Sequence, residues 1–283
     1  MTDRDTDHAS HHHGFSDAFA EHLDREALLA TGVTSRALDR AATALDRPVR
    51  TVLDLGSGTG SGTVALARRF PNAQVHSLDL STELLDRLAS AAARAGVSGQ
   101  VHPHPVDLDD DWTKLVPAGV DLAWASLSLH HVIDPALVLQ RALSVLRPGG
   151  VLVVTEMSGS IALEPDDLGT GRHGLADRVT DGLAALGHPS TAEWTVPLAE
   201  AGYVRTQREL TDLTVASDNA DGAAYLATQL SAWHNNLAQT LSSDDLIALK
   251  TAEREIRTGS SPVTQTSGRV VWIAFRPDAE SRK

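Results

Sequence analysis

Residues 52–63 read VLDLGSGTGSGT, an apolar run that contains Asp54 and is followed by glycine at every second position. A short apolar run predicts a buried β-strand, and the pattern over residues 62–69 predicts a helix directly after it. Glycine allows positive φ angles and lets a ligand lie against the backbone. A strand, a glycine turn and a helix N-terminus together form a binding place for nucleotide-like cofactors. The stretch therefore predicts a cofactor site at the end of a strand.

Strands and helices alternate after this stretch. The helix expected over 81–96 has Ser81 as its N-cap, and another begins at Asp134 and Pro135 and stops before residues 148–150. Alternation of this kind predicts βαβ units, and nearly continuous apolar strands predict a parallel sheet that is covered on both faces. With right-handed crossovers, we expect an α/β, doubly wound, Rossmann-like sheet whose ligand lies off the carboxyl ends of the strands. The expected strands are 51–55, 74–79, 100–106, 120–125 and 150–156.

The pattern divides the chain into four segments. Residues 1–14 hold His8, His11, His12 and His13 among small polar residues, and we expect a disordered tail there, with no metal site. Residues 15–47 predict N-terminal helices, and 48–156 the cofactor-binding core. Residues 157–283 predict the end of the sheet, with strands near 203–213 and 268–275, and helical cap insertions between them.

Composition excludes several classes of protein. The 283-residue chain has no cysteine, which excludes disulfides and thiolate chemistry and fits a cytoplasmic location. Its net charge of -13 and its lack of a basic cluster disfavour a nucleic-acid partner. The first residues lack the features of a signal peptide, and no apolar run is long enough to cross a membrane. Abundant alanine and only three lysines suggest a bacterial origin.

The glycine spacing decides against a dinucleotide. The GxGxxG pattern fails from Gly56, because its sixth position is Ser61, and Asp54 would repel a pyrophosphate while suiting a cationic group. Asp79 lies 19 residues beyond Gly60, where a carboxylate can accept both hydroxyls of a ribose. At the end of the third expected strand, Asp107 can accept from an adenine amino group.

Five motifs in order resemble those of class I S-adenosylmethionine-dependent methyltransferases. They are DLGSGTG, LDLS, VDLD, ASLSLHHVIDP and LRPGG, and they lie within about residues 50–156. The two late strands are consistent with the seven-stranded sheet and antiparallel last strand of that family. The resemblance implies S-adenosyl-L-methionine as cofactor, S-adenosyl-L-homocysteine as product, and methyl transfer to a small molecule.

The resemblance also implies roles for individual residues. Asp54 and the glycine backbone would hold the amino-acid end of the cofactor, and Asp79 would bind its ribose. Asp107 would bind the adenine amino group, with Leu80 and Leu108 packed against the ring. The complete set, with Ser126 near the sulfonium, is Asp54, Gly56, Ser57, Gly58, Gly60, Asp79, Leu80, Asp107, Leu108 and Ser126.

A general base is needed only if the acceptor loses a proton during transfer, as a hydroxyl does. His130 and His131 follow the fourth expected strand, and Glu156 ends the fifth, so all three point to the same edge. Each histidine could instead order the loop or contact the cofactor, and Glu156 could orient the substrate. His173, in a glycine-rich loop, is a weaker candidate for the base.

The acceptor pocket is expected in the cap. Four aromatic residues are candidates for its wall, although large aromatics pack in cores more often than they line pockets: Trp194, Tyr203, Tyr225 and Trp233. The N-terminal helices would either close over the cofactor or form a homodimer contact, and periodicity does not separate the two. Two other functions stay open, namely a cofactor-binding module without catalysis and a nicotinamide-dependent oxidoreductase.

Overall fold

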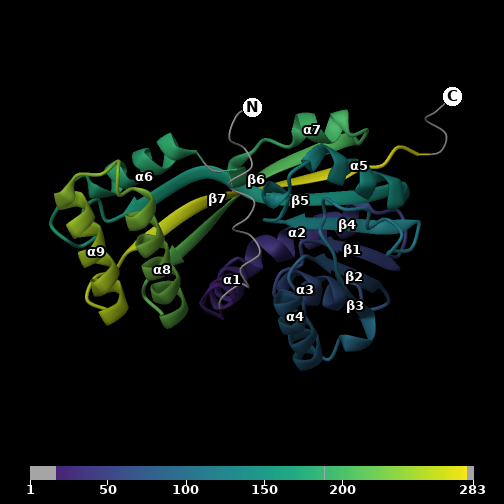
Figure 1. The fold of residues 1–283 in the computed structure, drawn as a ribbon, viewed down its shortest axis with the longest axis horizontal. Helices are drawn as coiled ribbons and strands as arrows, with labels where there is room; N and C mark the ends of the chain where they lie inside the picture. Colours follow the sequence, from purple (N-terminus) through teal and green to yellow (C-terminus); the bar gives the residue numbers. More distant parts are fainter. Residues whose placement is uncertain (1–16, 188, 279–283) are drawn as a thin grey trace.

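One mixed β-sheet runs through the whole protein (Figure 1). The computed structural model describes residues 17–187 and 189–278, and within these residues the sheet has seven strands in the order β3-β2-β1-β4-β5-β7-β6. β7 is antiparallel to both of its neighbours, and the other pairs are parallel. The predicted fold is therefore confirmed. The strands are β1 Thr51–Leu55, β2 Gln74–Asp79, β3 Val101–Pro105, β4 Val120–Ser126, β5 Leu146–Glu164, β6 Val204–Ala216 and β7 Thr264–Phe275.

Four of the described helices begin at short polar side chains that cap them. Ser81 and Asp134 accept hydrogen bonds from the backbone N–H of the residues three positions later, and Asn219 and Ser242 do the same in the cap. The α-helices of the described residues are α1 Asp17–Leu29, α2 Thr31–Ala44, α3 Ser61–Arg69, α4 Thr82–Ala95, α5 Pro135–Val145, α6 Leu175–Leu186, α7 Thr195–Glu200, α8 Ala220–Asn236 and α9 Ser243–Thr258. Short 3-10 turns include η3 Leu129–His131 and η4 Pro189–Thr191. None of the described helices is long and apolar enough to cross a membrane.

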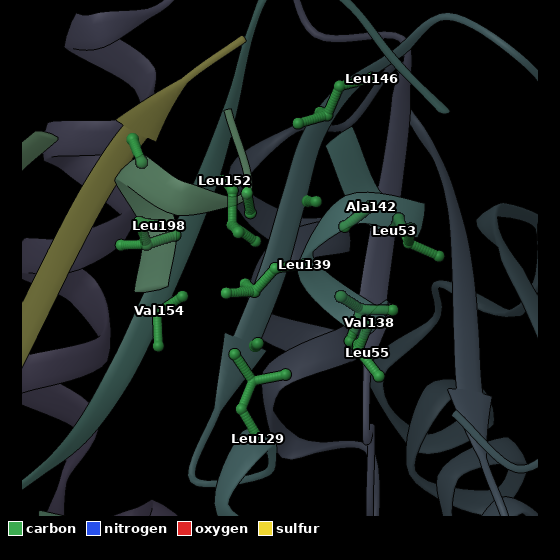
Figure 2. Close-up of a cluster of buried hydrophobic side chains, with 14 of the residues drawn as sticks. Leu53, Leu55, Leu129, Val138, Leu139, Ala142, Leu146, Leu152, Val154 and Leu198 are labelled. Atoms are coloured by element: carbon green, nitrogen blue, oxygen red, sulfur yellow. The ribbon is translucent and has the colours of Figure 1, made fainter. Parts of the chain in front are cut away.

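Two hydrophobic cores cover the two faces of the sheet. On one face, which we call the α5 face, Leu53, Leu55 and Leu152 pack against α5 and α7 (Figure 2). On the opposite face, the α3 face, Val52 and Val153 pack against α2, α3 and α4. Because side chains alternate along a strand, neighbouring positions of β1, β4 and β5 serve different cores. The polar residues at the strand ends are thereby held on a rigid support.

Strands β5 and β7 are longer than the sequence pattern predicted, and β6 lies close to its predicted position. β5 extends to Glu164 rather than to residue 156, and β7 begins at Thr264 rather than at 268. A bulge between Met157 and Ile161 interrupts the β5–β7 pairing, which then resumes. Hydrogen bonds to β6 and β7 thus stabilise polar and glycine-containing segments that have weak strand propensity of their own.

The extended ends of these strands support the helical cap. Helices α6, α8 and α9 pack on them around Leu163, Leu213 and Val215, forming a third hydrophobic cluster. Helix α1 contacts both α8 of the cap and α3 of the core, and Figure 1 shows it between these two parts. The histidines of the N-terminal tail lie outside the described residues.

Candidate functional site

The loop between β1 and α3 holds three glycines with positive φ. Gly56, Gly58 and Gly60 have φ angles of +71°, +54° and +90°, a region that favours glycine. A Cβ atom at Gly56 would collide with Ser128, and one at Gly60 would lie 2.8 Å from Leu88 Cα. A Cβ atom at Gly58 would meet nothing within 4 Å in the described part of the chain. Packing within the protein thus accounts for two glycines, and Gly58 is where the loop backbone is uncovered.

Asp54 is a buried carboxylate beside this loop. Its side chain lies on the α3 face, where Thr63 Oγ1 donates a hydrogen bond to Oδ2 at 2.6 Å. The residue is 3% exposed, and no ion pair to it is found among the described residues. Burial raises the pKa of Asp54 to about 7, while the bond from Thr63 opposes that rise. A cationic group placed here would restore the charged carboxylate.

Asp79 ends β2 and supports the glycine loop. The backbone N–H of Gly58 donates to Asp79 Oδ2 at 2.8 Å, and that of Ser81 donates to Oδ1 at 3.0 Å. Burial raises the pKa of Asp79, and these backbone bonds counteract the effect. Each carboxylate oxygen can accept a further hydrogen bond, which suits a pair of ligand hydroxyls. Leu80, the next residue, is 49% exposed and offers an apolar surface at the same edge.

Asp107 and Leu108 follow β3 at the neighbouring position. Asp79 and Pro105 are register partners, so Asp107 lies two residues beyond the level of Asp79. The Asp109 N–H donates to Asp107 Oδ1 at 2.9 Å, which fixes the turn. Leu108 is only 7% exposed and packs in the α5-face core. Leu80 and Leu108 were both predicted to pack against the adenine ring, and of the two only Leu80 is exposed.

The chain bends sharply where β4 ends. Ser126 is the last residue of β4 and is partly exposed, and Leu127 has a φ of +54°, which is uncommon for a residue other than glycine. The Leu127 N–H donates to Thr155 O at 2.8 Å, and Ser128 Oγ donates to Leu55 O at 2.7 Å. These bonds hold the bend over the ends of β1 and β5. The strained turn delivers η3 to the carboxyl edge of the sheet.

His130 and Glu156 form a close pair at this edge. His130 Nδ1 lies 2.8 Å from Glu156 Oε2, and both side chains are largely buried. Burial raises the pKa of Glu156, and the contact with His130 opposes the rise. When Glu156 is ionised it can only accept, so His130 Nδ1 carries the hydrogen and Nε2 is the nitrogen that can take up a proton.

His131 lies beside this pair but is exposed. Its ring centroid is 4.0 Å from that of His130, with a tilt of 45° between the rings. Turn η4 packs against η3 and β5, and Ser190 Oγ lies 3.2 Å from Met157 Sδ. The structure therefore brings all three candidate bases to one edge, and η4 covers them from the side of the cap.

His173 and most of the cap aromatics lie elsewhere. The His173 side chain is 91% exposed and sits 3.4 Å from Asp166. The Tyr203 hydroxyl donates to Leu139 O at 3.1 Å within the α5-face core, which also contains Trp194. Tyr225 is buried between α8 and α1, where its ring stacks on that of His22.

Two polar residues near the site are absent from the sequence predictions. Thr63 holds Asp54 in place, and Trp124 is the register partner of Asp54 on β4. Trp124 Nε1 is buried without a hydrogen-bond partner among the described residues, and it flanks Gly62 together with Asp54 Oδ2. The alternation of β4 could have placed Trp124 on the α3 face, but its pairing with β1 is a tertiary fact.

These groups fit S-adenosylmethionine. A buried carboxylate without a cation matches an ammonium group, and Asp79 at the end of the next strand matches the two ribose hydroxyls. The uncovered backbone at Gly58 lies between them. The donor set therefore agrees with the amino-acid and ribose parts of this cofactor.

Comparison with known proteins gives the same result. Residues 52–150 match the family model described as "Methyltransferase domain". The chain is 37% identical over 151 residues to malonyl-[acyl-carrier protein] O-methyltransferase of Laribacter hongkongensis, covering 48% of this chain and 47% of the relative. It is 31% identical over 195 residues to 27-O-demethylrifamycin SV methyltransferase of Amycolatopsis mediterranei, covering 68% and 65%. The chain thus spans less than two thirds of the length of either relative.

Solved structures share the fold. The crystal structure of YcgJ from Bacillus subtilis superposes with a TM-score of 0.54 at 17% identity, covering 87% of this chain and all of that one. Residues 52–150 are thus similar to methyltransferase domains, as the resemblance to class I S-adenosylmethionine-dependent methyltransferases predicted. The predicted family is confirmed, and the cofactor predicted from the sequence is the cofactor of that family.

Proposed function

We propose that the protein transfers a methyl group from S-adenosylmethionine to a small organic acceptor. The observation that carries the proposal is Asp54, a buried carboxylate beside a glycine loop that finds no cation within the described residues. An unpaired charge is expensive to bury, so such a group is retained where a ligand supplies the opposite charge. The glycine loop and Asp79 offer the remaining contacts of a nucleoside.

Each part of the cofactor is bound by different residues. Asp54 binds the ammonium group, Asp79 the ribose hydroxyls, and the predicted adenine contacts are Leu80, Asp107 and Leu108. When bound, the cofactor supplies a methyl group on a positively charged sulfur, which a nucleophile can attack in line. The protein then contributes alignment and exclusion of water more than covalent chemistry.

The pair formed by His130 and Glu156 favours O-methylation. His130 Nε2 takes the proton of an acceptor hydroxyl, while Glu156 holds Nδ1 and stabilises the resulting imidazolium. An N-methyl acceptor that is already deprotonated would not need this pair. The names of both relatives refer to O-methylation, which supports the same choice.

A small acceptor also agrees with the charge of the chain. A net charge of -13 disfavours nucleic acid. A homodimer contact through the N-terminal helices and a cytoplasmic location stay predictions from the sequence.

Thermal unfolding with separate ligands tests the proposal. We expect S-adenosylmethionine and S-adenosylhomocysteine to raise the melting temperature by a few degrees at about 100 times their dissociation constants, since this adds about 2.7 kcal/mol. NADH should have no effect. A shift with NADH alone would restore the oxidoreductase, and no shift with either adenosyl compound would refute the assigned site.

Two substitutions locate the binding site. Asp54→Asn should weaken S-adenosylhomocysteine binding by roughly a hundredfold, because the ammonium group loses its counter-charge. Asp79→Ala should reduce binding further, since it also releases Gly58. Asp39→Asn, an exposed position on α2, is the matched control and should bind as the unsubstituted protein does. Titration calorimetry gives all four affinities, and equal values would disprove the assignment.

A further inference from the structure

A buried ion pair joins α1 to β7. Arg269 is 1% exposed, and its Nη2 donates to Glu26 Oε1 at 2.8 Å. Its Nη1 donates to Ser267 Oγ at 3.1 Å. A buried pair of this kind adds little to stability, because desolvation offsets the attraction. Fold stability alone therefore does not explain a guanidinium that is buried where the apolar half of β7 begins.

Other polar groups surround Arg269. Tyr225 of α8 is fully buried, and its hydroxyl accepts a hydrogen bond from Gln229 Nε2 at 3.0 Å. Burial raises the pKa of Tyr225, and the adjacent Arg269 guanidinium opposes this rise. The His22 ring lies parallel to that of Tyr225 at 5.2 Å, and its Nδ1 is buried with no hydrogen-bond partner within the described ranges. Arg269, Ser267, Tyr225 and Gln229 together form what we call the Arg269 site.

The strand register places this site next to the proposed base. Glu156 is paired with Val270, and Met157 with Arg269, so the two functional positions are adjacent on the β5–β7 ribbon. β4 ends at Ser126, opposite Thr155, so in the described sheet the β4-facing edge of β5 has no strand beside it from residue 156 onward. A ligand at that edge can reach both faces of the ribbon.

The two groups point to opposite faces, because paired positions one residue apart alternate. Val270, paired with Glu156, belongs to the α5-face core, and Val271, two residues from Arg269, belongs to the α3-face core. The thickness of a sheet with its side chains is about 10 Å. A molecule that touches both groups therefore spans about that length.

Helix α1, which carries Glu26, is weakly attached. Ala20 is its one buried residue among those described, and Leu28 is 58% exposed. Its other ion pairs within the described residues, of Asp17 with Arg87 and of Arg25 with Asp221, are partly exposed. Exposed ion pairs contribute about 1 kcal/mol or less. An element of this kind opens at low free energy and can be displaced by a ligand.

We propose that the Arg269 site binds an acidic group of the acceptor, and that Glu26 occupies the site until the acceptor replaces it. The substrate class is then an extended organic molecule with a hydroxyl group at one end and a carboxylate or phosphate about 10 Å away. Only the identity of this ligand as the methyl acceptor rests on the proposed function. Binding of the anion does not.

Simple amphiphiles test the site without knowledge of the natural acceptor. Octanoate, octyl phosphate and 1-octanol share a chain of suitable length and differ in charge. Calorimetric titration of each into the full-length chain, with and without S-adenosylhomocysteine, measures the affinities. We expect both anions to bind and 1-octanol to bind at least about tenfold more weakly. The tighter anion identifies the acidic group as carboxylate or phosphate.

Substitutions separate the Arg269 site from unspecific binding. Glu26→Gln removes the internal competitor and should tighten octanoate binding by roughly tenfold. Arg269→Gln should weaken it by at least as much, and Arg269→Lys and Tyr225→Phe, which disturb the core less, should fall between. Glu253→Gln, a buried carboxylate with cationic neighbours on α9, is the matched control and should have no effect.

Amide exchange gives a second measurement. Octanoate should speed exchange in α1 of the unsubstituted protein, because Glu26 has been displaced. Absence of anion binding at millimolar concentrations, equal binding of 1-octanol, or octanoate affinities unaffected by Glu26→Gln and Arg269→Lys would each overturn the inference. Failure of S-adenosylhomocysteine to bind would instead refute the proposed function and leave the anion result standing.

Discussion

The carboxyl edge of the core and the cap both bury an aspartate, but they treat it in opposite ways. Asp245 in the cap is contacted by Arg178 at 2.8 Å and by Arg172, and these arginines hold its pKa well below the usual range. Asp54 at the core edge has no such neighbour in the described residues, and burial raises its pKa to about 7. A paired carboxylate ties elements together, whereas an unpaired one indicates a ligand.

The same contrast occurs within the core sheet. Asp121 lies at the amino end of β4 and accepts from Arg147 Nε at 2.8 Å and from the Arg50 N–H at 2.8 Å, with Arg47 also within reach. These contacts lower its pKa against the effect of burial. One end of the sheet thus holds a satisfied carboxylate and the other end an unsatisfied one. Substitutions at the two positions should therefore have opposite effects on stability.

The largest effect is expected for Asp54 as a function of pH. Its folded-state pKa of about 7 lies above the unfolded value, so the folded protein keeps the proton longer, and stability is present at low pH and lost as pH rises through 7. The loss reaches at most about 4 kcal/mol. Asp54→Asn does not titrate, so it should match the unsubstituted protein near pH 4 and exceed it near pH 8. Urea unfolding at each pH gives the free energy of unfolding of both proteins. A difference between them that stays constant across this range would contradict the claim that Asp54 is unpaired.

Asp121→Asn should act in the other direction and somewhat less strongly. Arg147 is itself buried and would keep only the exposed Asp46 as a counter-charge, so we expect the free energy of unfolding to fall by about 3 kcal/mol at neutral pH. Binding of S-adenosylhomocysteine should stay nearly unchanged, because Asp121 lies at the far end of the sheet. Urea unfolding and calorimetry measure the two quantities. If Asp121→Asn is as stable as the unsubstituted protein, the proposed difference between a paired carboxylate at one end of the sheet and an unpaired one at the other end is wrong.

Much of the core could be predicted because its signals are local. Ser81 and Asp134 cap helices, and the apolar runs around Leu53 and Val153 are strands at nearly the predicted positions. The extensions of β5 and β7 could not be predicted in the same way. The outer segment of β5 follows a bulge that contains Gly159, and its pairing, which resumes at Ile161, depends on hydrogen bonds from β7, a distant part of the chain.

The candidate site divides along the same line. Asp54 and Asp79 lie at the ends of β1 and β2, and Glu156 ends the strand predicted over 150–156, so motif spacing could place all three at one edge. The hydrogen bond between His130 and Glu156 depends on the turn at Leu127, which no pattern specifies. Arg269 could be noticed as a charge directly before the apolar run of β7, but its contact with Glu26 joins residues 243 positions apart. A contact between residues so far apart in the sequence can be identified only from the three-dimensional structure.

The smallest predicted effect belongs to His76, which extends the comparison to the sheet edge formed by β2 and β3. Its Nδ1 lies 3.0 Å from His104 Nε2 and its ring 5.0 Å from that of His102, and burial together with these neighbours lowers its pKa to about 4. The unfolded chain therefore takes up the proton first, and stability is lost as pH falls from about 6.5 to about 4.

His76 is half-buried, so this loss should be only about 1 kcal/mol after screening by solvent. His76 makes the free energy of unfolding rise with pH, whereas Asp54 makes it fall over an overlapping pH range. The unsubstituted protein alone therefore shows only the difference between the two contributions. Urea unfolding of His76→Gln beside Asp54→Asn separates the two, because each variant loses one slope and keeps the other. If His76→Gln and the unsubstituted protein differ by the same free energy near pH 4 and pH 8, the histidine cluster does not titrate with folding. Of the two groups, only Asp54 at the carboxyl edge of the sheet would then make the free energy of unfolding depend on pH.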